Sequence, residues 1–228
     1  MTPHLSRGDL EQLSLPYVRR YLKHATLYIG ERCSCILPEE MLKIISGLRM
    51  YQLPLSPDGS ILGATAVEDT VLTLKSRNGE ETPVRLQAGD ILIDSGLRTR
   101  YGSGCRNFTI LHEAAHQILY RTFPGAMSGL RLRTFVEYRS ASDFRGPIDW
   151  NEWQADTLAS FLLMPDCVVR NAMREVEWNP ARTHVDSSSY FTFCSLANLL
   201  GVSQKALELR LRRMQLIDFV EYPKRYIL

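Results

Sequence analysis

The feature that most constrains this chain is the stretch 108–117, which reads F-T-I-L-H-E-A-A-H-Q and contains the pattern H-E-x-x-H. The two alanines favour a helix here. On a helix, His112 and His116 are offset by only about 40° and lie about 6 Å apart along the axis, so both imidazoles leave one face and can bind one metal ion. Glu113 projects beside them as a base for a water molecule. The pattern is typical of a zinc hydrolase.

The same pattern also has an ordinary structural interpretation. Three fixed residues arise by chance in on the order of one chain in a hundred. A single histidine on an apolar helix is more often a hydrogen-bonded core residue than a ligand, and Phe108, Ile110 and Leu111 make this stretch apolar. The metal hypothesis therefore needs a third ligand and a group that orients the histidines.

A second helix is expected from residue 149, where D-W-N-E-W-Q-A-D opens an apolar run that ends before Pro165. Glu152 and Asp156 are one turn apart and share a face of this helix. We expect Glu152 to be the third zinc ligand, which leaves the fourth position for water. We expect Asp156 to accept a hydrogen bond from a ligating histidine, which fixes the tautomer of that ring.

Each of these acids also has a simpler interpretation. Asp149 is a candidate N-cap, and Glu152 is then its capping-box partner. Asp156 could be an ordinary solvated carboxylate on a helix. Taken alone, each simpler interpretation is preferable. Because both acids follow the H-E-x-x-H pattern at one-turn spacing, we favour the ligand and the orienting role.

Composition narrows the class of protein. The chain has 228 residues, enough for one large domain or a domain with a small appendage. Its net charge of +2 gives no general reason to expect a polyanionic partner. The number of cysteines is odd and no C-x-x-C pair occurs, which favours reduced thiols in the cytosol. No signal peptide and no apolar run of membrane-spanning length is visible. We therefore predict a soluble cytoplasmic protein without a membrane partner.

Helix signals come first along the chain, and a group of strand signals follows them. Before the motif, helices are expected at 17–25, after Pro16, and from Pro38 to near Tyr51. β-rich runs follow at 61–67, 70–75, 83–86 and 90–94, with an Asn78-Gly79 hairpin turn among them. Residues 98–106 are expected to form a polar loop, the motif helix to end near Thr122, and a further strand to lie at 134–138. These signals predict an α+β fold with a small antiparallel sheet packed against helices.

The stretch 193–207 is typical of a helix–turn–helix. Gly201 supplies the turn and Ser203 caps the following helix. The second helix is basic, through Lys205, Arg210, Arg212 and Arg213. It is either a recognition helix that contacts DNA or part of a helical pair that packs on the rest of the chain with solvated arginines. The near-neutral net charge favours packing, and DNA binding stays open.

Two longer motifs resemble a known family. R-N-F-T-I-L-H-E-A-A-H, followed by N-E-W-Q-A-D-T-L-A-S-F-L-L-M-P, resembles the ImmA/IrrE metallopeptidases over roughly residues 90–215. The resemblance implies that His112, His116 and Glu152 are zinc ligands and that Glu113 is the catalytic base. The order of the two motifs is also similar to thermolysin-like gluzincins, in which the later aspartate supports a ligating histidine.

The chain departs from the family pattern at a few points. Leu111 stands where alanine or glycine is common, and Ala115 stands where glycine is common. The separation between His116 and Glu152 is longer than usual, which suggests an inserted loop near the cleft. Oxyanion-stabilising donors are not evident. His184, Tyr120 and Tyr138 are candidates, and each is more readily explained as structural.

The resemblance also implies a fold and a biology. We expect a zincin-like helical metallopeptidase core: an N-terminal helical segment at 1–55, the zinc domain with its small sheet at 56–180, and a helix-turn-helix-like segment at 181–228 packed on it. Members of the family often relieve repression by cutting a helix-turn-helix repressor. We therefore expect a zinc-dependent endopeptidase with a protein substrate, a transcriptional repressor of a mobile element or stress response. The alternative is a DNA- or protein-binding regulator that keeps the zinc domain as a scaffold, against which the intact Glu113 argues.

Overall fold

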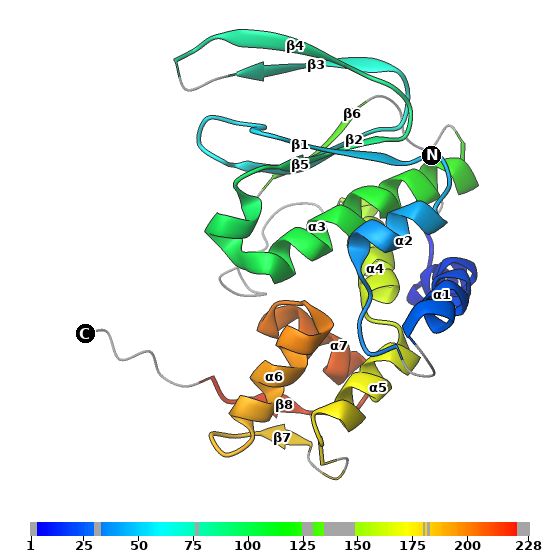
Figure 1. Cartoon of the computed structure of the whole chain (residues 1–228), viewed down its shortest axis with the longest axis vertical. Coiled ribbons are helices and arrows are strands. Elements are labelled where there is room, and N and C mark those ends of the chain that lie inside the picture. The colour runs from blue at the N-terminus through cyan, green and yellow to red at the C-terminus, as the bar shows by residue number, and fades with distance from the viewer. Residues whose placement is uncertain are drawn as a thin grey trace.

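The computed structural model of the chain describes residues 4–29, 33–75, 78–124, 130–134, 149–179, 181 and 183–222. The fold is α+β, as predicted. Figure 1 shows three levels: the hairpin β3–β4 above, a sheet beneath it, and the helices below, with α3 running along the sheet. The helices are α1 Arg7–Ile29, α2 Pro38–Ile44, α3 Leu97–Thr122, α4 Trp150–Leu163, α5 Asp166–Glu175, α6 Tyr190–Leu200 and α7 Gln204–Arg213. The strands are β1 Arg49–Leu53, β2 Ile61–Ala66, β3 Thr70–Lys75, β4 Glu81–Leu86, β5 Asp90–Asp94, β6 Leu130–Thr134, β7 His184–Val185 and β8 Phe219–Val220.

The main sheet has four strands in the order β1-β5-β2-β6 and is mixed, not antiparallel as predicted. β2 runs antiparallel to β5 and β6, but β1 runs parallel to β5. The helix expected to reach Tyr51 ends at Ile44, and the chain turns at Gly47 (φ +74°) into β1. At the start of the parallel pair, Arg49 Nε lies 2.7 Å from Asp90 Oδ1. The edge strand was missed because its apolar residues also continue the helical stripe of α2.

The first helix is longer than predicted and includes Pro16. Its start is capped reciprocally: the Ser6 N–H donates to Asp9 Oδ2 at 2.8 Å, and the Asp9 N–H donates to Ser6 Oγ at 3.2 Å. Leu10, Val18 and Tyr21 are buried on one face. Burial of this face offsets the hydrogen bond that the proline cannot make.

The polar loop expected at 98–106 is also wrong, because α3 already begins at Leu97. The helix breaks at Gly102, whose φ of +84° and ψ of 170° are not helical. The buried Leu97 anchors the segment before the break. The end of α3 at Thr122 and the strands 70–75 and 90–94 agree with prediction. The predicted strand at 134–138 overlaps β6 only at Thr134, and its other residues lie outside the described part.

The two faces of the sheet pack against different partners. The main hydrophobic cluster lies on the α3 side and draws Ile91 and Ile93 from β5 together with residues of the helices. The second cluster lies under the β3–β4 hairpin and contains Leu55, Ala64, Ala66, Leu86 and Leu92. Alternation along β5 sends Leu92 to one cluster and its two neighbours to the other. The division of the chain at residues 55 and 180 stays a prediction.

In the C-terminal part, α6 and α7 are joined through Gly201, which is left-handed with φ +65°. Ser203 caps α7 by accepting from the Ala206 N–H at 3.2 Å. This local geometry agrees with the predicted pair of helices, while its identity as a helix-turn-helix DNA-binding element stays a prediction. None of the described helices combines the length and apolar character needed to cross a bilayer.

Candidate metal centre

Helix α3 carries His112, Glu113 and His116, all buried. It is fixed against the sheet by Gln117, whose Nε2 donates to Thr65 Oγ1 and to the Ala66 carbonyl, each at 2.7 Å. These bonds tie the residue after His116 directly to β2. The motif therefore lies on a helix whose depth and rotation against the sheet are set.

Two further bonds fix α3 from its other neighbours. Asn107 Nδ2 donates to the Gly201 carbonyl at 2.9 Å, in the connection between α6 and α7. Arg106 Nη1 lies 2.6 Å from Glu39 Oε1 on α2. Gly104 packs closely on the same connection, because a Cβ there would lie 2.5 Å from the Ser203 backbone nitrogen. The helical elements around α3 thus hold the segment just before the motif.

Helix α4 brings the two acidic residues to α3. Asp149 is its N-cap and accepts from the backbone N–H groups of Asn151 at 2.9 Å and Glu152 at 3.4 Å. The Glu152 side chain points instead to the histidines. The capping interpretation is therefore correct for Asp149, and it leaves the Glu152 carboxylate available for the site.

The donor atoms of His112, His116 and Glu152 converge. The two Nε2 atoms lie 3.0 Å apart. Glu152 Oε2 lies 3.1 Å from His112 Nε2, and its Oε1 lies 3.2 Å from His116 Nε2. Ligands of a tetrahedral zinc ion, with bonds of about 2.0–2.1 Å, lie roughly 3.3 Å from one another. The three residues therefore form a group that could hold a metal ion.

The protonation of His112 supports this interpretation. Its Nδ1 lies 2.9 Å from Asp156 Oδ1. An ionised carboxylate can only accept a hydrogen bond, so Nδ1 carries the proton and Nε2 of the neutral ring presents a lone pair. That lone pair faces the carboxylate oxygen of Glu152, which also only accepts. Such an arrangement is repulsive unless a proton or a cation lies between the two atoms, and a cation matches the donor set.

Glu152 is suited to bind a cation because it stays ionised. Burial raises the pKa of this carboxyl group, but the His112 and His116 rings, when protonated, outweigh burial and hold the pKa well below its usual range. The side chain is still 37% exposed.

Glu113 follows His112 on α3 and does not belong to the group that the three donors form. Its fully buried side chain faces Gly63 of β2: a Cβ at position 63 would lie 2.7 Å from Glu113 Oε1 and 2.8 Å from Thr109 Cγ2. The glycine therefore makes room for this carboxylate. Sequence reasoning missed Gly63, although a glycine inside a β-rich run often marks a close approach to another group.

The oxyanion candidates are engaged elsewhere. The Tyr120 hydroxyl donates to Glu68 Oε1 at 3.1 Å. His184 lies on β7, where its Nε2 is 3.4 Å from Glu221 Oε1 and its ring stacks on Phe219. Tyr138 lies outside the described residues. Neither described candidate belongs to the group that could hold a metal ion.

The basic helix α7 is partly used in packing. Arg210 is buried: its Nε donates to the Met164 carbonyl at 2.8 Å, and its guanidinium lies 4.9 Å from the centre of the Phe161 ring. Its Nη2 lies 3.3 Å from Asp166 Oδ1. The expectation of a solvated or DNA-contacting side chain is therefore wrong for Arg210, which attaches α7 to the end of α4. Lys205 and Arg212 remain exposed and pair with Glu208.

Comparison with models of known protein families and with curated proteins finds no match to this chain. The resemblance to ImmA/IrrE metallopeptidases stays a prediction from the two motifs. What can be inferred about function therefore depends on the geometry of the candidate metal centre.

Proposed function

We propose that this protein is a zinc-dependent endopeptidase of the ImmA/IrrE type. The observation that carries the proposal is the convergence of His112 Nε2, His116 Nε2 and the Glu152 carboxylate within hydrogen-bond distance of one another. Two imidazoles and one carboxylate are a common donor set for catalytic zinc, and three protein ligands leave one position for water or substrate.

The residues around the donors fit this assignment. His112, His116 and Glu152 would hold the ion, and Asp156 would keep His112 in the tautomer that presents Nε2. A zinc ion bound there supplies a water of pKa about 7 and polarises the carbonyl of the scissile peptide. Zinc is preferred to other metals because it tolerates mixed nitrogen and oxygen ligands in a four-coordinate site.

Glu113 is the proposed general base. Its carboxylate takes a proton from the attacking water as the oxygen–carbon bond forms, and it passes that proton to the amine nitrogen as the carbon–nitrogen bond breaks. The chain makes room for this side chain with Gly63. A regulator that used the domain only as a scaffold would need neither the carboxylate nor the glycine, so both features favour the enzyme.

The substrate that we propose is a helix-turn-helix repressor encoded near this protein. This part of the proposal rests on the resemblance of the two motifs to a family that cuts such repressors. The packing of Arg210 favours a C-terminal pair of helices that belongs to the body of the protein. DNA binding through the exposed part of α7 is the alternative, and loss of DNA retention on substitution of Lys205 and Arg212 would support it.

The test is cleavage of candidate repressors on co-expression, read on gels, with zinc measured in the purified protein. Glu113→Gln should keep the zinc and the fold and lose cleavage by on the order of a hundredfold or more, because the base is removed. Glu40→Gln, an exposed glutamate on α2, is the matched control and should cut normally. If Glu113→Gln cuts a verified substrate as fast as the parent, the peptidase mechanism is wrong and the regulator takes its place.

A further inference from the structure

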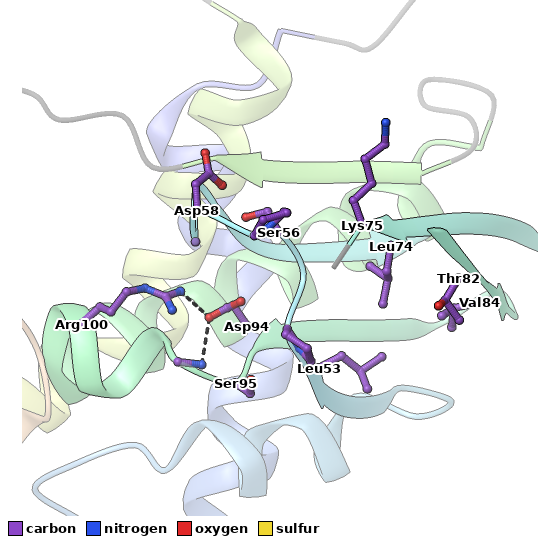
Figure 2. Close-up of a pocket in the computed structure, with 14 residues that line it drawn as sticks. Leu53, Ser56, Asp58, Leu74, Lys75, Thr82, Val84, Asp94, Ser95 and Arg100 are labelled. Atoms are coloured by element: carbon purple, nitrogen blue, oxygen red, sulfur yellow. Dashed lines mark hydrogen bonds and ion pairs between the residues drawn. The ribbon is translucent and has the colours of Figure 1, made fainter. Parts of the chain in front are cut away.

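A cavity lies between the β3–β4 hairpin and the main sheet, on the side of the sheet away from the metal centre. Its volume is about 730 Å³. Figure 2 shows that its walls come from the hairpin, from the segment after β1 and from the start of α3. Leu53, Pro54, Leu74 and Val84 provide its apolar surface. Cavities of roughly 300–1,000 Å³ with mostly apolar walls are typical small-molecule sites.

The cavity borders the second hydrophobic cluster. Leu53, Leu72, Leu74 and Val84 pack on that cluster but stay only partly buried. Two hydrogen bonds hold the base of the β3–β4 hairpin. The Gly89 N–H donates to the Ala66 carbonyl and the Ala88 N–H donates to Asp69 Oδ1, each at 2.9 Å.

One end of the cavity carries a fixed cation, Arg100. Its guanidinium occupies a slot between two glycines: a Cβ at Gly59 would lie 2.6 Å from Arg100 Cζ, and a Cβ at Gly96 would overlap the same group. Nη2 of Arg100 pairs with Asp94 Oδ1, as the dashed line in Figure 2 shows. The side chain of Arg100 is 36% exposed, whereas that of Asp94 is 2% exposed.

Asp94 holds the guanidinium in place and is itself saturated. Its Oδ1 also accepts from the Gly96 N–H at 2.9 Å, and its Oδ2 accepts from the Leu55 N–H at 3.1 Å. A guanidinium has five N–H donors in a fixed fork. Asp94 contacts Nη2 alone, so Arg100, which lines the cavity, keeps N–H donors that a planar anion such as a carboxylate can use.

The other charged groups at the rim restrict the ligand further. Lys75 pairs with Glu81 on the neighbouring strand at 2.9 Å, and both side chains are exposed at the outer edge of the hairpin. Asp58 also lines the cavity, with its pKa held below the usual range by hydrogen bonds from Ser60, and its carboxylate opposes a second negative charge on the ligand. A molecule with one carboxylate and an apolar body fits these features better than a dicarboxylate or a phosphate.

We propose that this cavity binds a small organic monocarboxylate, with the carboxylate on Arg100 and the hydrocarbon body under Leu74 and Val84. The site is separate from the metal centre and does not depend on the proposed peptidase activity. It gives this protein a second binding function, on the opposite face of the sheet.

The probe for this site is decanoate, titrated into the purified full-length chain by calorimetry, with 1-decanol as an uncharged analogue. The parent should bind decanoate with a Kd on the order of 10–100 µM, as expected for a ligand of this size, and bind decanol at least tenfold more weakly. Arg100→Gln should weaken decanoate binding at least tenfold, while Arg98→Gln, on the same turn of α3 but outside the cavity, should not. Leu74→Phe, which fills the cavity and keeps Arg100, should also weaken binding at least tenfold.

Two controls keep the result unambiguous. A carboxylate could bind at the metal centre instead, so the titration is repeated with His116→Ala, in which decanoate affinity should be unchanged. If Arg100→Gln does not fold because Asp94 loses its partner, Leu74→Phe and the comparison with decanol decide the question. Absence of decanoate binding to the parent, equal affinity for decanol, loss of binding in His116→Ala, or unchanged binding in Leu74→Phe would each overturn the proposal.

Discussion

The two faces of the main sheet are packed very differently. On the α3 face, Ile91 and Ile93 lie in a continuous core with the helices, and the candidate ligands and base project from the helices that this core holds. On the hairpin face, Leu92 belongs to a small cluster with a cavity beside it. The same strand thus borders a continuous core on one face and a small cluster with a cavity on the other. The chain is therefore packed tightly on the face where the candidate donor atoms converge, and it has a cavity on the opposite face.

The largest expected effect comes from removing core side chains on the two faces. Leu111→Ala, next to His112 and fully buried, should lower the free energy of unfolding by about 2–5 kcal/mol. Leu74→Ala, on the partly exposed cavity wall, should lower it by less than about 1 kcal/mol, because little packing is lost. Urea denaturation measures both. Equal losses would show that the hairpin face is packed as tightly as the α3 face.

The second prediction compares an aspartate that contacts a candidate ligand with one at the base of the hairpin. Asp156→Asn should weaken zinc affinity or activity roughly ten- to a hundredfold, because the amide no longer fixes the His112 ring in its tautomer. Asp69→Asn, at the base of the hairpin, should change neither by more than about twofold. Zinc affinity is measured by competition with a chelator. A normal affinity in Asp156→Asn would remove Asp156 from the site.

The third prediction compares two glycines. Gly63→Ala should reduce proteolysis on the order of tenfold with zinc retained, because the added methyl group displaces Glu113 from its position. Gly79→Ala, in the hairpin turn with open space around it, should leave proteolysis unchanged even if strain lowers stability. Activity per bound zinc is the quantity to compare. Full activity in Gly63→Ala would mean that Glu113 does not depend on this contact.

The sequence predicted the local parts of the site better than its surroundings. The spacing of His112 and His116, and of Glu152 and Asp156, is a property of one helical turn each, so it can be read without the fold. The structure brings His112, His116 and Glu152 together as expected. Gly63 and Gln117 were missed because their roles arise from packing between α3 and β2, which are far apart in the chain.

The errors in the fold have related physical causes. The sequence predicts a helix only after Pro16 and a loop at 98–106, but α1 includes Pro16 and α3 begins at Leu97. Burial of Leu10 and of Leu97 stabilises the helical segments before Pro16 and before Gly102. Strand β1 is not predicted, because its residues continue the helical pattern of α2. Its partner in the sheet, β5, lies later in the chain, so the pairing is not visible locally. The sequence pattern predicts one group of exposed basic residues on α7. Arg210 is instead buried and donates to the Met164 carbonyl, a contact between segments far apart in the chain.

The metal content of the purified protein tests the central claim most directly. The account predicts about one zinc per chain, with X-ray absorption showing two imidazole nitrogens and carboxylate oxygen at about 2.0–2.2 Å. His116→Ala should lose the zinc, and Glu152→Gln should bind it more weakly. The control variant His24→Ala, on α1 and outside the group, should keep it. A parent protein that binds no zinc when zinc is supplied, or a His116→Ala variant with full occupancy, would contradict the account.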